Sequence, residues 1–187
     1  MGRWYGSHYV EWFRQAIGVL NRSGGRPQSS QFVQIRPLPV IKQVIAMFFS
    51  ANSDRFREAQ PYLEKFILNR EQNGLPPDIR VFAYYTIGST TRSIGVSGAI
   101  SFDSGTVRIM SEISFRPFGY VLSFGANPPD SRLTDISHFA HYAYDESVDL
   151  TIRLPMLDAH LPLPGDYRTR DEIDSDERAN AAFEDDH

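Results

Sequence analysis

The sequence predicts an α+β fold in which N-terminal helices pack on a mostly antiparallel sheet of about five strands. Two observations carry this prediction: apolar residues recur at helical spacing over residues 1–72, and the period changes to two over residues 78–160. Helices and strands are therefore segregated along the chain, whereas a parallel doubly wound sheet would alternate them. We expect a single domain over residues 1–165. The acidic tail, 166–187, holds little that could pack and is expected to be disordered.

The helical half divides into three stretches. The first helix follows Ser7, a residue type favoured at N-caps, and ends at the glycine pair at 24–25. A second helix over 39–50 is apolar around most of its circumference, which indicates a central position. A third stretch, 54–68, is interrupted by a proline, since the residue before a proline resists the α conformation.

The sheet half follows a turn-rich segment that ends at Asp78. Alternation predicts strands at 79–87, 94–102, 107–115, 118–124 and 148–154, with a further short strand or extended link at 31–36. The second and third of these form the clearest hairpin, through the tight turn at 103–105. Between them and the last strand, a short helical turn is expected at 137–141. Glu112 shares a strand face with Arg116, and we expect an ion pair between them on the solvent side.

Composition limits the classes of chemistry. The chain of 187 residues has no cysteine, which excludes disulfides, iron–sulfur clusters, thiolate zinc sites and thiol nucleophiles within it. No apolar run approaches the length of a membrane span, so we expect no membrane association and a cytoplasmic location. The net charge of −4 conceals a gradient, because residues 1–80 carry +5, residues 81–165 carry −3 and residues 166–187 carry −6.

The sharpest local signal for a metal is the pair His138 and His141. On a helix, a spacing of three places both imidazoles on one face, where a third ligand could complete a divalent metal site. Asp135, Glu112 or His160 are the candidates for that ligand. The alternative is that the two histidines cap, stack or face solvent, and no cofactor is required by this sequence.

Two glycine-containing segments approach known motifs. Residues 95–99 resemble G-x-S-x-G, but Ala99 replaces the last glycine and the segment lies inside a predicted strand instead of at a strand-to-helix turn. Residues 88–92 form a polar loop whose backbone amides could hold a phosphate, although a hairpin loop needs no ligand. Neither segment indicates a catalytic class.

Arginines in the helical half are the case for nucleic-acid binding. Arg14, Arg22 and Arg26 are the leading candidates, with further arginines at 36, 55 and 57. A net charge of +5 over 80 residues is modest for such a function, and a solvated basic face is the alternative.

Several strings resemble the C-terminal portion of a group of uncharacterised bacterial proteins. They are GRWYGSHYVEWFRQ (2–15), PLPVIKQVIAMFFSANSDRFRE (37–58), FILNREQNGLPPDIRVF (66–82), SEISFRPFGYVLSFGANPPDSRLTDISHF (111–139) and LPGDYRTRDEI (163–173). Proteins of that group carry an N-terminal part similar to HNH or treble-clef zinc modules with paired cysteines. This chain has no cysteine, so the resemblance transfers no zinc site and no nuclease residue to it.

The resemblance and the aromatic N-terminus together lead to the functional expectation. Trp4, Tyr5 and Trp12 carry large apolar surfaces near the first residue and are expected to form an interface with a missing N-terminal module or a protein partner. We therefore expect a non-catalytic recognition or scaffolding domain of an HNH-like protein, translated here as a truncated product. Two alternatives remain open: a metal-dependent hydrolase or nuclease that uses the histidine pair with a carboxylate, and a homo-oligomeric partner-binding protein.

Overall fold

The computed structural model describes residues 2–25, 29–86, 88, 91–100, 107–125, 130–158 and 167–185. Its elements confirm the α+β class and run along the chain as α1 (Gly2–Arg22), β1 (Ser30–Ile35), α2 (Pro37–Ala51), α3 (Asp54–Ala59), α4 (Pro61–Leu68), β2 (Ile79–Tyr85), β3 (Arg92–Ile100), β4 (Val107–Phe115), β5 (Phe118–Phe124), β6 (Thr134–Asp135), the 3₁₀ helix η1 (Ser137–His141), β7 (Val148–Ile152) and α5 (Arg170–Asp185).

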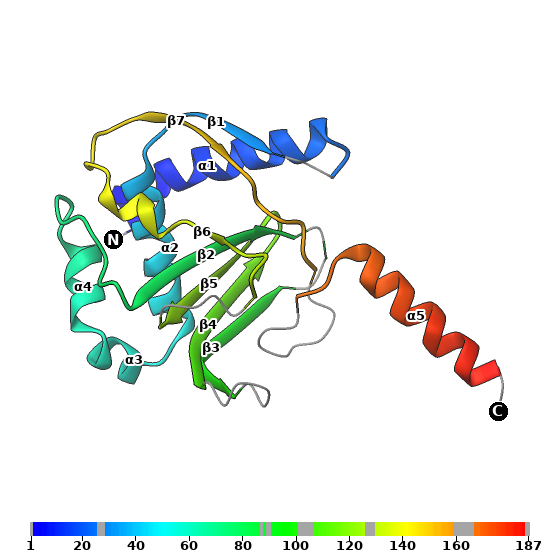
Figure 1. The fold of residues 1–187 in the computed structure, drawn as a ribbon. Coiled ribbons are helices and arrows are strands. Elements are labelled where there is room, and N and C mark those ends of the chain that lie inside the picture. The colour runs from blue at the N-terminus through cyan, green and yellow to red at the C-terminus, as the bar shows by residue number, and fades with distance from the viewer. Residues whose placement is uncertain are drawn as a thin grey trace.

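The strands form two antiparallel sheets. The larger sheet has the order β3-β4-β5-β2-β6, and the two strands of the predicted hairpin, β3 and β4, pair at one edge of it. The tight turn predicted at 103–105 lies outside the described residues. The smaller sheet pairs β1 with β7, which come from opposite ends of the chain and lie across α1 (Figure 1). The predicted short strand at 31–36 and the predicted last strand thus pair with each other, outside the main sheet.

Each face of the larger sheet has its own cover. One face carries Val81, Tyr120 and Leu122 and packs in the main core with α1, α2, α4 and η1. Helix α2 is the centre of this layer, and most of its side chains are buried, as its all-round apolar character predicted. The opposite face carries Tyr84 and Val121 in a smaller cluster, covered by segments from the C-terminal third of the chain.

Tyr5 and Trp12 belong to the core, so the prediction that they form an interface is wrong. Both are fully buried: the Tyr5 hydroxyl donates to the backbone oxygen of Ile67 at 2.8 Å, and the Trp12 ring stacks on Phe32 with centroids 3.9 Å apart. The chain itself supplies the cover, because β1 and β5 close over the inner face of α1. Of the three aromatic residues predicted to form the interface, Trp4 alone is substantially exposed, at 45%.

The C-terminal segment also differs from the prediction. Residues 170–185 form α5, where a disordered tail was expected, and Ile173 in its first turn is buried. Thr169 and Glu172 bond to each other's backbone amides, at 3.2 and 2.6 Å respectively, which is the reciprocal capping box that starts a helix. Beyond this start, α5 projects away from the body (Figure 1). None of the described helices combines the length and apolar composition that a bilayer span requires.

Candidate functional site

The two histidines of the predicted metal site lie on the surface. His138 and His141 are exposed on η1 and border a hollow of about 350 Å³ together with Tyr142 and Glu146. Asp135 is engaged elsewhere: its carboxylate accepts from Arg80 and from the backbone amide of residue 137. Within the described part of the chain, no three His, Asp or Glu side chains are grouped to hold a metal ion. His160 lies outside the described residues.

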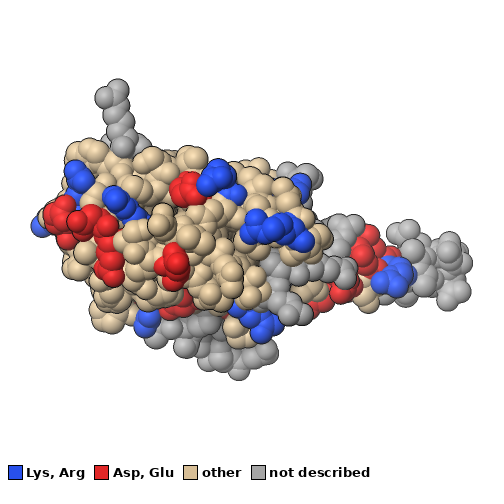
Figure 2. Space-filling view, turned by 90° about the horizontal axis from the view of Figure 1, so that it is seen from above, with Lys and Arg blue, Asp and Glu red and all other residues tan. Residues whose placement is uncertain are grey.

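Two of the arginines predicted to form a basic face, Arg14 and Arg22, lie on α1. Arg14 is exposed and paired with Glu11 at 2.8 Å within α1, and Arg22 is exposed in the last turn of that helix. Arg26 lies outside the described residues. On the side where α1, β1 and β7 lie, basic and acidic groups are scattered over a mostly uncharged surface (Figure 2).

The polar loop at 88–92 is held by a carboxylate from the chain itself. Asp158 is buried and accepts hydrogen bonds from the Gly88 amide at 3.0 Å and from the Thr86 hydroxyl at 2.9 Å. A backbone amide that could have bound phosphate therefore already has an internal anion. Residues 87, 89 and 90 lie outside the described part of the loop.

Glu112 is the centre of a buried polar cluster, and its predicted ion pair with Arg116 is wrong. It is 1% exposed and pairs with Arg92 on the neighbouring strand, while Arg116 is exposed. Two phenols complete the cluster: Tyr84 donates to Oε1 at 2.7 Å and Tyr167 donates to Oε2 at 3.1 Å. Burial and the charge of Glu112 raise the pKa of both phenols. The carboxylate is thus saturated and closed to solvent, which is unsuited to a general base.

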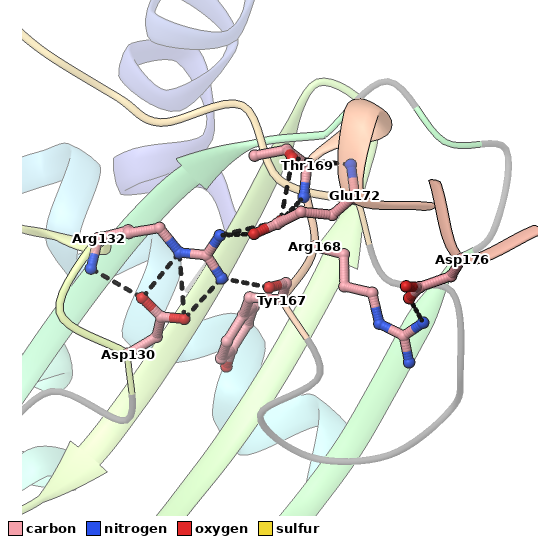
Figure 3. Close-up of polar contacts among 7 residues, drawn as sticks. All are labelled: Asp130, Arg132, Tyr167, Arg168, Thr169, Glu172 and Asp176. Carbon is pink, nitrogen blue, oxygen red and sulfur yellow. Dashed lines mark hydrogen bonds and ion pairs between the residues drawn. The ribbon is translucent and has the colours of Figure 1, made fainter. Parts of the chain in front are cut away.

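Tyr167 belongs to a segment, 167–173, that covers this cluster, and we call this segment the clasp. Arg132 ties it down by pairing with Glu172 at 3.1 Å and donating to the Tyr167 backbone oxygen, while Asp130 holds the other side of the same guanidinium (Figure 3). Arg168, which precedes α5, forms an ion pair with Asp176 on that helix at 2.9 Å (Figure 3).

A hollow of about 530 Å³ lies beside the clasp, but its polar groups are largely occupied. Arg132 and Thr169 in its wall take part in the contacts just described, and Thr134 donates to the Arg153 backbone oxygen at 2.5 Å. The clasp is therefore a structural cover for this face of the sheet, and the hollow beside it is not a candidate site.

The opposite face offers an open site, which we call the corner cleft. It has a volume of about 660 Å³ and lies where α2 ends and α3 begins, against β3 and β4. Its lining consists of Ala51, Asn52, Ser53, Arg55, Phe56, Ala59, Gln60, Asp78, Gly95, Val96, Ile109 and Phe124. The apolar floor is open to solvent, because Val96 is 41% exposed and Ile109 is 43% exposed.

The local sequence explains why the cleft exists. The ladder between β3 and β4 is irregular between Ile94 and Ser97, and Asn52 at the end of α2 fills this bulge. Its side-chain oxygen accepts from the Val96 amide at 2.6 Å, and its amide donates to the Ser111 hydroxyl at 3.0 Å. Helix α2 is thereby fixed to the edge of the sheet, and the sheet extends past the cover of the helices.

Charged groups at the cleft are available to a ligand. Arg55 and Asp78 are both exposed, and neither side chain is paired with another side chain among the described residues. An open apolar floor with a few polar groups around it is the usual composition of a ligand site.

Sequence reasoning missed this cleft and the clasp, although it used some of their residues. The sequence pattern places Arg55 in a predicted basic face and relates residues 95–99 to a serine motif. One signal was readable: Thr169-x-x-Glu172 has the capping-box pattern of a helix start. Comparison of the chain with protein-family models, with curated proteins and with solved structures finds no match.

Proposed function

We propose that this chain is a non-catalytic recognition domain that binds its partner in the corner cleft. The observation that carries the proposal is the exposed apolar floor of Val96 and Ile109 beside Arg55 and Asp78, whose side chains have no side-chain partner among the described residues. An apolar ligand in the cleft would cover the exposed side chains of Val96 and Ile109, next to Phe56 and Phe124. Removing this apolar surface from water favours binding.

The resemblance to the C-terminal portion of HNH-associated bacterial proteins suggests how such a domain would be used. In that arrangement the zinc module would act and this domain would position it by binding. We place this activity in the cytoplasm, which agrees with a chain that has no cysteine.

Fluorescence of the apolar anionic dye 8-anilinonaphthalene-1-sulfonate, titrated into the whole chain, tests the cleft directly. The dye is expected to bind, and Val96→Asp and Ile109→Asp are expected to weaken binding by about tenfold, since each replaces part of the apolar floor with a charge. Val10→Asp is the matched control, because Val10 is 61% exposed on α1 and does not line the cleft. Equal binding by all four proteins would show that the corner cleft is not the preferred apolar site.

A second measurement addresses catalysis. If the chain is non-catalytic, calorimetry with Zn²⁺ should show no stoichiometric binding that depends on the histidine pair. The variants His138→Ala and His141→Ala test that dependence. A tight site lost in both variants would instead support the metal-dependent hydrolase or nuclease.

A further inference from the structure

We infer that the partner of the corner cleft is an extended peptide segment that adds as a strand to the free edge of β3 and places an apolar side chain in the cleft. This inference rests on the proposed function and adds the chemical class of the ligand. Two independent observations meet at the same place: a strand edge with no partner strand in the described part of the chain, and an open apolar pocket on the sheet face beside it.

The edge of β3 is available for pairing. β3 is the terminal strand of the larger sheet, and β4 is the one strand that pairs with it among the residues the structure describes. Alternate residues of an antiparallel strand direct their N–H and C=O groups away from the neighbouring strand. In the described structure, residues 93–100 make no backbone–backbone hydrogen bond to a partner outside the sheet.

The same edge lacks most features that normally protect an edge strand. Residues 93–100, SIGVSGAI, contain no charge and no proline, and β3 is nine residues long. At the opposite edge, β6 has two residues, which is too short to template another strand.

The bulge divides β3 into two parts with different roles. Asn52 already occupies the Val96 amide, so an added strand cannot pair there. The register with β4 is regular again from Ser97 to Ile100, and this is where we place the backbone hydrogen bonds. The bulge turns Val96 toward Ile109 in the cleft, where an apolar residue of the peptide would pack.

Charge complementarity indicates which charged residues the peptide should carry. Arg55 favours an acidic residue in the peptide, and Asp78 favours a basic one, beside the apolar anchor. Strand addition takes most of its affinity from the main chain and its specificity from side-chain pockets, which matches this division of the site.

Nuclear magnetic resonance of the ¹⁵N-labelled whole chain tests the inference with the capped peptide acetyl-Glu-Thr-Val-Phe-Val-Thr-Lys-amide. Binding should shift the amides of Val96 and of residues 97–100, and not the amides of the control helix α1. Two analogues of this peptide are methylated on alternate backbone nitrogens. One analogue lacks the N–H donors of one edge of the extended peptide, and the other lacks those of the opposite edge. The analogue that lacks the pairing edge should bind at least about tenfold more weakly.

Charge reversal supplies the second arm. Arg55→Glu should weaken binding of the same peptide, and a peptide with lysine in place of its glutamate should restore it. Arg14→Glu is the matched control on α1, outside the cleft.

The outcomes separate this inference from the proposed function. Equal binding by both methylated analogues would overturn strand addition while leaving the cleft as a binding site. Dye binding at the cleft without any peptide binding would overturn the peptide as partner. Loss of both would remove the proposed function as well.

Discussion

At the scale of single residues, Glu112 shows how a charge is accommodated inside this sheet. Its two carboxylate oxygens receive hydrogen bonds from Tyr84 and Tyr167, and Arg92 provides the counter-charge. Taking a carboxylate and a guanidinium out of water is unfavourable, and only a complete set of partners offsets that desolvation. We therefore assign Glu112 a structural role that links the sheet to the clasp.

Replacing Glu112 should be strongly destabilising. Glu112→Gln leaves Arg92 buried without its counter-charge, and we expect the free energy of unfolding to fall by about 3–5 kcal/mol in urea titrations. Glu58→Gln is the control, since Glu58 is exposed on α3, and it should change stability by less than about 0.5 kcal/mol. Replacing Arg92 and Glu112 together by leucine should recover part of the loss. An unchanged midpoint in Glu112→Gln would contradict the structural role.

Lys42 is another buried charge, and it makes stability depend on pH. Its ammonium is fully buried and donates to the backbone oxygens of Phe66 and Asn69, both at 2.6 Å, near the end of α4. Burial lowers the pKa of Lys42 from 10.5 to about 8, only partly opposed by the negative charge of Glu71.

The sign of the pH dependence follows from that shift. Between pH 8 and 10 the unfolded chain keeps a proton on Lys42 that the folded chain has released, so the free energy of unfolding should rise with pH, by about 1–2 kcal/mol between pH 7.5 and 9.5. Above pH 10 the trend should reverse, because burial raises the pKa of Tyr5 and Tyr85 to about 12 in the folded state. Urea unfolding at several pH values measures this. Lys42→Met should remove the rise, and a rise of the same size in that variant would refute the assignment.

At the scale of elements, the pairing of β2 with β5 depends on one glycine. Gly119 lies directly opposite Tyr84, and a Cβ at this position would stand 1.9 Å from the tyrosine ring. The ring cannot move aside, because Tyr84 is fully buried and its hydroxyl is bound to Glu112. The close approach of this strand to an aromatic ring therefore requires glycine.

Gly119→Ala should thus lower the free energy of unfolding by about 3 kcal/mol or more, as overpacking in a rigid core does. The matched control is Gly6→Ala on α1, where nothing lies within 4 Å of the added Cβ. In a helix that change should stabilise by about 0.5–1 kcal/mol. Thermal unfolding of both variants measures the contrast, and similar midpoints would show that the β2–β5 packing is described wrongly.

At the scale of the whole molecule, Trp12 joins elements from distant parts of the chain. Its ring stacks on Phe32 and Phe118 and meets Phe139 edge-on, and its indole nitrogen donates to the Tyr120 hydroxyl at 3.0 Å. Helix α1, the small sheet, the large sheet and η1 therefore share one core, and the N-terminal helix is an integral part of the domain.

Truncating the two tryptophans should separate core from surface. Trp12→Ala is expected to lower the free energy of unfolding by about 3–5 kcal/mol, through lost contacts and a cavity. Trp4→Ala should cost less than about 1 kcal/mol, because Trp4 is 45% exposed. Chemical denaturation checks both values. A loss for Trp4 as large as that for Trp12 would show that Trp4 is packed in the core and is not a surface residue.

The sequence by itself determined the class of the fold and most of its elements. Helical spacing, prolines and alternation are local signals, and they placed the third helical stretch, the hairpin and the short turn at 137–141 close to where the structure has them. The buried centre of α2 could also be predicted, since a helix that is apolar on all sides has no solvent face.

Only the tertiary structure decided which strands pair and where the charged groups lie. Alternation specifies the face of a residue within its strand, but not what covers that face, so Glu112 could not be assigned to Arg92 in place of Arg116. The corner cleft likewise depends on Asn52 meeting a bulge more than forty residues later in the chain. Contacts between residues far apart in sequence leave no local pattern, which is why the candidate site became visible only in the fold.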